Sequence, residues 1–299
     1  MNILITGATG FVGVPLCKAL DAKGHRLLVV SRSPEKVSEQ LGMPVKAQDD
    51  PMAFKDEPID AIINLAGASI AGRPWTDSRK KTLIDSRVET TRALERLCQA
   101  MSTPPKVLVS GSAMGYYGAQ GEREVTEETP PNPEFAHELC QKWEDAARRI
   151  EALGVRTAII RIGLVLERDG GTLKPMLPVY KLGLGATLGS GTQYMPWIHR
   201  TDLIRIIEFL LAHDTLEGPF NAGAPNPVTN RVFTKSLAHA LHRPAPWRIP
   251  GFALKAAMGE MSRLLLTGAR MKPARLEAAG FEFRYPELDG AFSAIVNGR

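Results

Sequence analysis

A glycine motif near the start of the chain carries the first chemistry that the sequence suggests. Gly7, Gly10 and Gly13 follow a short apolar run, Ile3–Ile5, and precede an apolar helical pattern. In this order of strand, turn and helix, the first glycine permits a tight turn and the second lets backbone N–H groups approach a pyrophosphate. The third lets the helix pack on the strand, so that its N-terminus faces the phosphates. The motif therefore predicts a dinucleotide site.

The end of the second predicted strand, residues 26–31, indicates which nicotinamide cofactor fits. A site for NAD usually has Asp or Glu there to hold the ribose 2′-hydroxyl. This sequence has Ser31 and Arg32 instead, and its first acid, Glu35, lies in the next turn. Arg32 can pair with a 2′-phosphate through two hydrogen bonds, and Ser31 can donate to the same phosphate. The sequence therefore predicts NADP over NAD; the alternative is that Arg32 is a solvated loop cation.

Strands and helices alternate along the first two thirds of the chain. Further strands are predicted at 26–31, 44–47, 61–65, 106–110 and 156–161, separated by helices at 11–23, 34–41, 76–101 and 134–153. The alternation predicts an α/β fold with a doubly wound parallel sheet of Rossmann type. Residues 197–199 are predicted to return as a strand to the edge of that sheet, and residues 219–221 to form another short strand.

The composition of the sequence changes after residue 168, where a stretch rich in glycine and proline begins. Residues 170–198 are too long for a simple connector and are predicted to be a lid-like insertion. Prolines then separate three helical pieces, at 232–242, 252–266 and 273–279. We expect an NADP-binding domain over residues 1–223. Residues 224–299 would form a small C-terminal cap that closes over the cofactor and helps to bind substrate.

Composition narrows the class of protein. The 299 residues carry a formal charge of +5 with dispersed basic residues, which does not indicate a nucleic-acid site. Three scattered cysteines form no pattern for a disulfide frame or a metal. Because the glycine motif begins near residue 3 of this sequence, we expect no signal peptide, and no apolar run is long enough to predict a span of a bilayer. We expect a cytoplasmic monomer or homodimer that acts on a small molecule, without a metal, nucleic-acid or membrane partner.

Four motifs along the chain form a combination: Gly7 to Gly13, Asn64-Leu65-Ala66-Gly67, Ser110-Gly111-Ser112-Ala113 with Tyr116-Tyr117-Gly118, and Trp197-Ile198-His199-x-x-Asp202-Leu203. Together they resemble the extended short-chain dehydrogenases/reductases, the NAD(P)-dependent epimerase/dehydratase superfamily. More narrowly, the chain is similar to the atypical, YfcH-like epimerase family proteins. That likeness rests on Asp85-Ser86-Arg87, Thr126-Glu127-Glu128, Arg161 to Leu166, Lys181 to Gly185, Asn221 and Ala278 to Phe283. The resemblance covers essentially the whole chain.

The resemblance implies a set of cofactor contacts, which are carried over onto matching positions of this chain. They are Gly7, Thr9, Gly10, Phe11, Val12, Gly13, Ser31, Arg32, Leu65, Ala66, Arg87 and Arg161. Arg87 would reach the cofactor from the long helix, and Arg161 would stand at the end of the sixth strand. Either could instead be a structural arginine in an ion pair.

The resemblance also implies a catalytic pair that this sequence lacks. Short-chain dehydrogenases place Tyr-x-x-x-Lys on the helix after the fifth strand, where lysine lowers the tyrosine pKa and the phenol shuttles a proton. None of the five tyrosines has a lysine four residues later, and the alignment puts Ala136 and Cys140 at the two positions. Substitutes that the chain offers are Ser112, Tyr116, Tyr117, His137, Cys140 and His199. Of these, Ser112 and Tyr117 are the catalytic candidates.

Three of the substitutes also have a structural interpretation. Cys140 can be a small buried apolar residue, and His199 can hold a loop by hydrogen bonding. One tyrosine of the pair after Ser112 can simply pack in the core. The sequence thus favours an NADP(H)-binding oxidoreductase or epimerase-like protein with an unidentified, sugar-like or hydroxylated substrate. The alternative is a non-catalytic NADPH-binding regulator or sensor. A flavin-binding relative fits less well, because Arg32 suits a 2′-phosphate.

Overall fold

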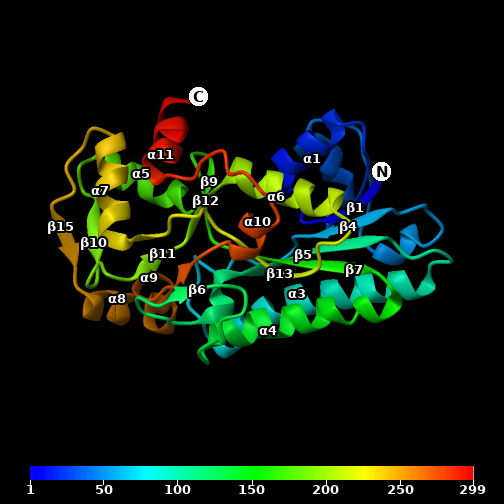
Figure 1. Cartoon of the computed structure of the whole chain (residues 1–299), viewed down its shortest axis with the longest axis horizontal. Helices are drawn as coiled ribbons and strands as arrows, with labels where there is room; N and C mark the ends of the chain where they lie inside the picture. Colours follow the sequence, from blue (N-terminus) through cyan, green and yellow to red (C-terminus); the bar gives the residue numbers. More distant parts are fainter. Residues whose placement is uncertain (299) are drawn as a thin grey trace.

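Seven parallel strands form the central sheet of the structure, a computed structural model that describes residues 1–298. The strand order is β13-β7-β5-β4-β1-β2-β3, so the chain winds outward in both directions from β1 (Figure 1). Their bounds are β1 Asn2–Thr6, β2 Arg26–Val30, β3 Lys46–Gln48, β4 Ala61–Asn64, β5 Val107–Ala113, β7 Arg156–Ile162 and β13 Gly218–Ala222. The doubly wound, Rossmann-type sheet is confirmed.

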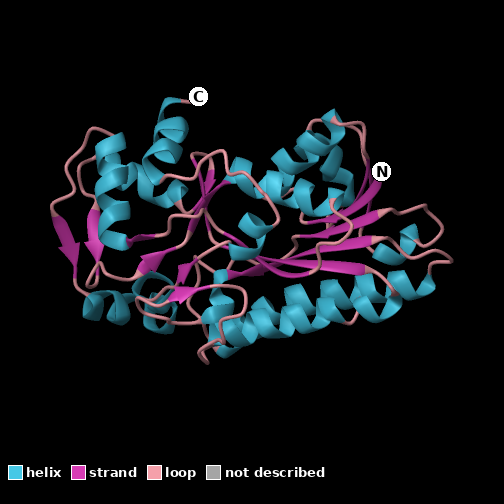
Figure 2. Cartoon of the chain, in the orientation of Figure 1, coloured by secondary structure: helices cyan, strands magenta, loops and turns pink. Residues whose placement is uncertain are grey.

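Helices cover both faces of this sheet because its strands are apolar on both sides. Ile3 and Ile5 pack in one core, whereas Leu4 packs in the other. The first face is covered by α1 (Gly13–Ala22), α2 (Val37–Leu41), α6 (Arg200–Ala212) and α10 (Ala274–Ala278). The second is covered by α3 (Asp77–Ala100), α4 (Phe135–Arg148) and the 3-10 turn η2 (Pro51–Phe54), and Figure 2 shows the helices in these two layers. Short 3-10 turns accompany these helices at η1 (Pro34–Lys36), η3 (Met114–Tyr117) and η4 (Glu151–Leu153).

A smaller core adjoins the carboxyl end of β7 and gathers segments that are far apart in the sequence. Its helices are α5 (Leu173–Lys181), α7 (Asn230–Ala240) and α11 (Leu288–Asn297). The strands nearby are β8 (Leu164–Glu167), β9 (Gly170–Gly171), β10 (Ala186–Leu188), β11 (Tyr194–Met195), β12 (Trp197–His199), β14 (Val228–Thr229) and β15 (Trp247–Ile249). Within residues 1–298, no helix is both long enough and apolar enough to cross a membrane.

The last part of the chain does not stay in this smaller core. The short strand β16 (Arg270–Met271) pairs with β6 (Glu124–Val125), and α10 packs on β13 of the central sheet. The division into domains at residue 223 and the lid role of residues 170–198 stay predictions. The predicted lid segment itself is folded, since α5 buries Leu173, Leu177 and Tyr180 in the smaller core.

Two predicted elements were wrong in detail. Residues 197–199 do form a strand, but β12 pairs with β8 in a separate sheet, and β13 occupies the edge of the central sheet. The helix predicted over 252–266 is divided into α8 (Gly251–Met258), the 3-10 turn η5 (Gly259–Ser262) and α9 (Arg263–Leu266). The division falls at Gly259, whose φ of +57° cannot continue a right-handed helix.

Candidate functional site

The glycine turn after β1 has the geometry that the sequence predicted. Gly7 has a φ of +75°, and a Cβ there would lie 2.7 Å from the carbonyl carbon of Leu65. A Cβ at Gly13 would lie 2.2 Å from the carbonyl oxygen of Gly7. Both glycines therefore allow backbone segments to meet where side chains could not fit. Thr9 and Gly10 are exposed at the tip of the turn, where a phosphate could reach their backbone.

A buried hydrogen-bond network fixes the end of β4 beside this turn. The Thr6 hydroxyl donates to Oδ1 of Asn64 at 2.7 Å and accepts from the backbone N–H of Ala66 at 3.2 Å. The Asn64 amide in turn donates to the Thr91 hydroxyl of α3 at 2.9 Å. Leu65 and Ala66 are thereby held against Gly7. Sequence reasoning did not identify Thr6 or Thr91, because the pairing of β1 with β4 brings Thr6 to Asn64 and the packing of α3 on the sheet brings Thr91 there.

The Phe11 side chain packs the glycine turn against β9, beside the smaller core. Its ring lies on β9 so closely that a Cβ at Gly170 would be 2.1 Å from a ring carbon. The Arg200 guanidinium lies 4.8 Å from the centre of the same ring and forms an ion pair with Asp169 at 2.7 Å. The turn and the segment that follows β8 are therefore one packed unit.

Ser31 and Arg32 directly follow β2, which pairs with β1 up to the register Thr6–Val30. The side chain of Arg32 is exposed, and no carboxylate in residues 1–298 forms an ion pair with it. The Ser31 hydroxyl oxygen accepts from the backbone N–H of Ser33 at 3.3 Å, which leaves its own hydrogen free to donate. The arrangement suits a phosphate ester at the end of β2.

The guanidinium of Arg87, a half-buried cation, lies against the loop that follows β4. Its guanidinium donates to the carbonyl oxygens of Leu83 at 2.9 Å and Ala68 at 3.1 Å, and lies 5.1 Å from the Trp143 ring centre. A Cβ at Gly67 would lie 2.9 Å from its central carbon. Burial lowers the pKa of Arg87, and no acidic side chain of the described chain pairs with it. Such a cation fits an anionic ligand nearby.

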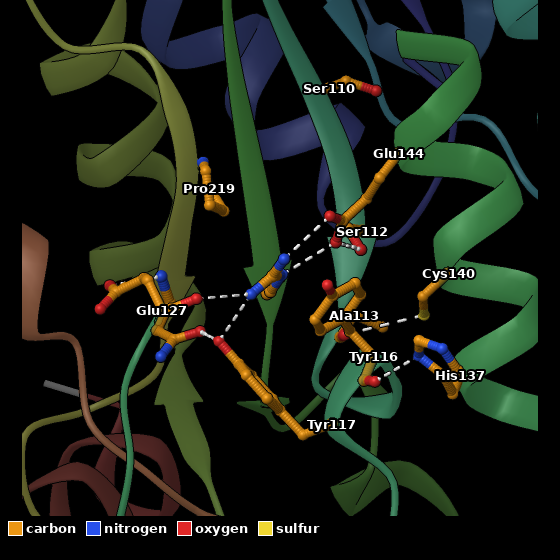
Figure 3. Close-up of polar contacts among 12 residues, drawn as sticks. Ser110, Ser112, Ala113, Tyr116, Tyr117, Glu127, His137, Cys140, Glu144 and Pro219 are labelled. Atoms are coloured by element: carbon orange, nitrogen blue, oxygen red, sulfur yellow. Dashed lines mark hydrogen bonds and ion pairs between the residues drawn. The ribbon is translucent and has the colours of Figure 1, made fainter. Parts of the chain in front are cut away.

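Arg161 occupies a different environment, a buried ion pair with Glu144, whose carboxylate lies beside Ser112 in Figure 3. Its guanidinium donates two hydrogen bonds of 2.9 Å to Glu144 of α4, and both side chains are almost fully buried. Burial alone would lower the pKa of Arg161, but the hydrogen bonds and charge of Glu144 hold it above its usual range. The Ser112 hydroxyl donates to the same carboxylate at 2.7 Å. Arg161 thus has the structural partner that the sequence left open, and its predicted cofactor contact stays a prediction.

Tyr117 also belongs to this buried network. Its hydroxyl donates to Oδ1 of Asn221 at 2.6 Å and accepts from Arg161 at 2.9 Å. Burial is the main reason that the pKa of Tyr117 rises to about 12, despite the adjacent guanidinium. The backbone N–H of Asn221 donates to Oε1 of Glu127 at 2.9 Å, which connects the network to β13. Arg161 and Glu144 therefore connect Tyr117 to Ser112, but both are fixed, buried groups, and their catalytic roles stay predictions.

The positions aligned with the missing Tyr and Lys face a segment of backbone. A Cβ at Gly115 of η3 would lie 3.1 Å from the Cβ of Ala136 and 3.6 Å from Sγ of Cys140. Burial raises the pKa of Cys140 to about 12, which disfavours the thiolate. The small side chains at 136 and 140 let η3 lie close to α4.

Tyr116 and His137 are the half-buried candidates beside this segment. The Tyr116 ring centre is 3.4 Å from the central carbon of the Arg161 guanidinium, and the two aromatic rings meet edge to face at 5.3 Å. Nδ1 of His137 lies 2.7 Å from the Tyr116 carbonyl oxygen. Because a carbonyl only accepts, Nδ1 carries the proton and Nε2 is the ring nitrogen left for another partner.

His199 caps a helix in this structure. Its Nδ1 accepts from the backbone N–H of Thr201 at 3.1 Å, at the start of α6. Its ring stacks on Tyr285 at a centroid distance of 4.0 Å. Burial lowers the pKa of His199, which favours the neutral ring that can accept this bond. These contacts agree with the structural interpretation of His199.

Comparisons with known proteins agree with this geometry. The chain matches the NAD dependent epimerase/dehydratase family over residues 3–223 and a domain of unknown function (DUF1731) over residues 249–295. It is 37% identical to the epimerase family protein YfhF of Bacillus subtilis, covering 100% of this chain and 99% of that protein. It is 39% identical to the epimerase family protein Mb2239 of Mycobacterium bovis, covering 97% and 95%. The crystal structure of human epimerase family protein SDR39U1 (isoform 2) with NADPH matches with a TM-score of 0.91 at 34% identity, covering all of both chains.

Proposed function

Because this chain belongs to the NAD-dependent epimerase/dehydratase family, we propose that it binds NADPH in preference to NADH. In this site the cofactor would supply hydride for the reduction of a small, hydroxylated molecule, or, in its oxidised form, would take a hydride and return it for an epimerisation. The glycine turn would hold the pyrophosphate, and Ser31 with Arg32 would hold the 2′-phosphate. Arg87 would offset the remaining negative charge.

The observation that carries the preference for NADPH is the unpaired cation at the end of β2. Arg32 is exposed beside the glycine turn and has no ion-pair partner in residues 1–298. A carboxylate at this place would repel a 2′-phosphate, whereas a guanidinium can form two charge-assisted hydrogen bonds with it. The similar human protein, whose crystal structure is one with NADPH, supports the same choice.

The test is a titration of the purified protein with NADPH and with NADH, followed by cofactor fluorescence. One charged hydrogen-bonded contact contributes about 1.5–3 kcal/mol, so Arg32→Ala should weaken NADPH binding roughly 10- to 150-fold and leave NADH binding unchanged. Lys55→Ala, which removes one exposed positive charge elsewhere, is the matched control. Equal affinity of the unaltered protein for the two cofactors would refute the proposal.

A second candidate function, a non-catalytic NADPH-binding regulator or sensor, is favoured by the buried network. Ser112 and Tyr117 are bound to Glu144, Asn221 and Arg161, and η3 covers the positions of the missing pair. A protein that only senses NADPH needs no side chain that moves a proton.

Deuterium transfer separates the two candidates even while the substrate is unidentified. NADPH carrying deuterium on one face of C4 is incubated with the protein and an extract of small metabolites, and products are analysed by mass spectrometry. An enzyme transfers the label from only one face of the ring, so the cofactor labelled on the other face is the control. Stereospecific labelling of a metabolite supports hydride transfer. If neither face gives labelling, net reduction is refuted, and the regulator is favoured over a reductase.

A further inference from the structure

Exposed apolar side chains are concentrated in one part of the molecule. We define the outer lobe as residues 173–195 and 228–258, which include α5, α7, α8, β10 and β15. Of the eight large apolar side chains exposed in residues 1–298, seven belong to it: Val179, Leu182, Leu184, Val232, Trp247, Ile249 and Phe252. In Figure 1, α7, β10, β15 and α8 form the end of the molecule opposite α1 and the N terminus. A concentration of this kind marks an interaction surface.

The charge of the outer lobe is of one sign. Its two segments contain no Asp or Glu, and their basic residues are Lys174, Lys181, Arg231, Lys235, Arg243, Arg248 and Lys255. None of these seven takes part in the ion pairs of the described chain, which join cations and carboxylates of other segments. The helix α11, which packs on α7, contributes one acidic residue, Asp289. The lobe therefore presents uncompensated positive charge among exposed apolar side chains.

Helix α8 shows how little of this lobe is covered. Its sequence, Gly-Phe-Ala-Leu-Lys-Ala-Ala-Met, contains one charged residue, yet none of its residues is buried. Phe252 is 77% exposed at its start. A helix of a globular protein normally turns its apolar face to a core. The apolar surface of α8 is thus left for a partner outside the chain.

A groove beside α8 combines the two features. It has a volume of about 620 Å³ and lies between the Gly189–Ser190 turn and the start of α8. Arg248 and Lys255 line it together with Phe252 and Leu266. The Arg248 guanidinium is oriented by a 2.7 Å hydrogen bond to the Gly189 carbonyl oxygen. Cations next to apolar side chains match a phosphate headgroup that is joined to acyl chains.

We propose that the outer lobe docks on the surface of a bilayer that contains anionic phospholipid. The negative potential of such a surface attracts Lys and Arg side chains, while Trp and Phe side chains lie at the level of the headgroups. A second copy of this chain would bring two positive lobes together, which repel. A soluble acidic protein would satisfy the cations but leaves no reason for an aromatic side chain as exposed as Phe252. The proposal departs from the expectation, based on the dispersed charge of the whole chain, of a protein without a membrane partner.

The tryptophans provide a direct readout of this contact. Trp247 is 57% exposed, whereas Trp75, Trp143 and Trp197 are at most 8% exposed. We expect the emission of the full-length protein to shift to shorter wavelength with vesicles of equal phosphatidylcholine and phosphatidylglycerol. The shift should be absent with phosphatidylcholine alone and in Trp247→Phe, and it should be reversed by high salt.

Vesicle sedimentation of charge variants tests the residues. Removing one surface cation costs about 1 kcal/mol, or about fivefold in partitioning, so Arg248→Gln/Lys255→Gln should weaken binding roughly 25-fold. Lys18→Gln/Lys55→Gln removes two exposed cations outside the lobe and should bind within about twofold of the unaltered protein. All of these side chains are exposed, so the variants should fold.

Three results would overturn the proposal. The first is an absence of binding to anionic vesicles, and the second is equal weakening by the two pairs of substitutions. The third is a shift of Trp247 emission to shorter wavelength in the absence of lipid. Such a shift on addition of polyglutamate would indicate that the partner is an acidic protein. Such a shift accompanied by dimers in light scattering would indicate a second copy of the chain. Cofactor titration is measured separately, so loss of NADPH binding would refute the proposed function and not this docking.

Discussion

Glu144 is the residue whose substitution most directly tests the buried network. Its carboxylate is fully buried and accepts hydrogen bonds from Ser112 at 2.7 Å, from Arg161 at 2.9 Å twice, and from Arg148 at 3.0 Å. Glu144→Gln keeps the size of the side chain and removes its charge. The Arg161 guanidinium, 2% exposed, would then be buried beside a neutral amide.

The expected loss follows from the charge that remains. Breaking a buried ion pair by removing one partner costs about 3–5 kcal/mol, because the other charge stays desolvated without compensation. Since whole domains are stable by about 5–15 kcal/mol, this is a large fraction of the total. A loss of this size corresponds to a decrease in Tm of roughly 5–8 °C for a chain of this length.

Urea unfolding followed by circular dichroism measures the difference in stability. The control is Glu138→Gln on the same helix, since Glu138 is 53% exposed and pairs with Lys142 on the surface. That variant should lose less than about 0.5 kcal/mol. The reasoning is refuted if Glu144→Gln lies within about 1 kcal/mol of the unaltered protein while Glu138→Gln behaves as expected.

Three further predictions use other parts of the structure. Because the pKa of His199 is lower in the folded chain, the unfolded chain binds more protons as the pH falls. The free energy of unfolding should therefore be at its full value above about pH 6.5 and decrease below it. His199→Asn, which can still cap α6, should lessen that pH dependence in urea titrations at several pH values. All three cysteines are buried, so a thiol reagent at pH 8 should label none of them quickly until urea is added: Cys17, Cys98 and Cys140. Gly170→Ala should cost about 1–3 kcal/mol, because its methyl group would collide with Phe11, whereas Gly290→Ala, with open space in α11, should stabilise by up to about 1 kcal/mol. Rapid native labelling of Cys140, or an unchanged urea midpoint in Gly170→Ala, would contradict the packing described above.

The sequence predicted the elements of the first two thirds of the chain closely, because their signals are local. The strand near 61–65 is β4 at 61–64, and the long helix near 76–101 is α3 at 77–100. In the smaller core, periodicity predicted α7, near 232–242, but missed two other helices. Pro175 and Pro178 obscure the helical pattern of α5, whose buried face becomes evident only from its packing. The C-terminal helix α11 was not predicted, although it buries Phe292 and Ile295.

The candidate site divides in the same way. The glycine turn and the Ser31–Arg32 end of β2 could be predicted from the sequence, because the spacing of a few neighbouring residues defines the turn and the charge. The burial of Ser112 and Tyr117 could not. Ser112 lies opposite Arg161 only because β5 pairs with β7, and Glu144 reaches both from a helix that covers the sheet. Contacts among separate strands and helices have no fixed spacing along the chain, so the tertiary structure alone decided which polar residues bind one another and which remain free for a ligand.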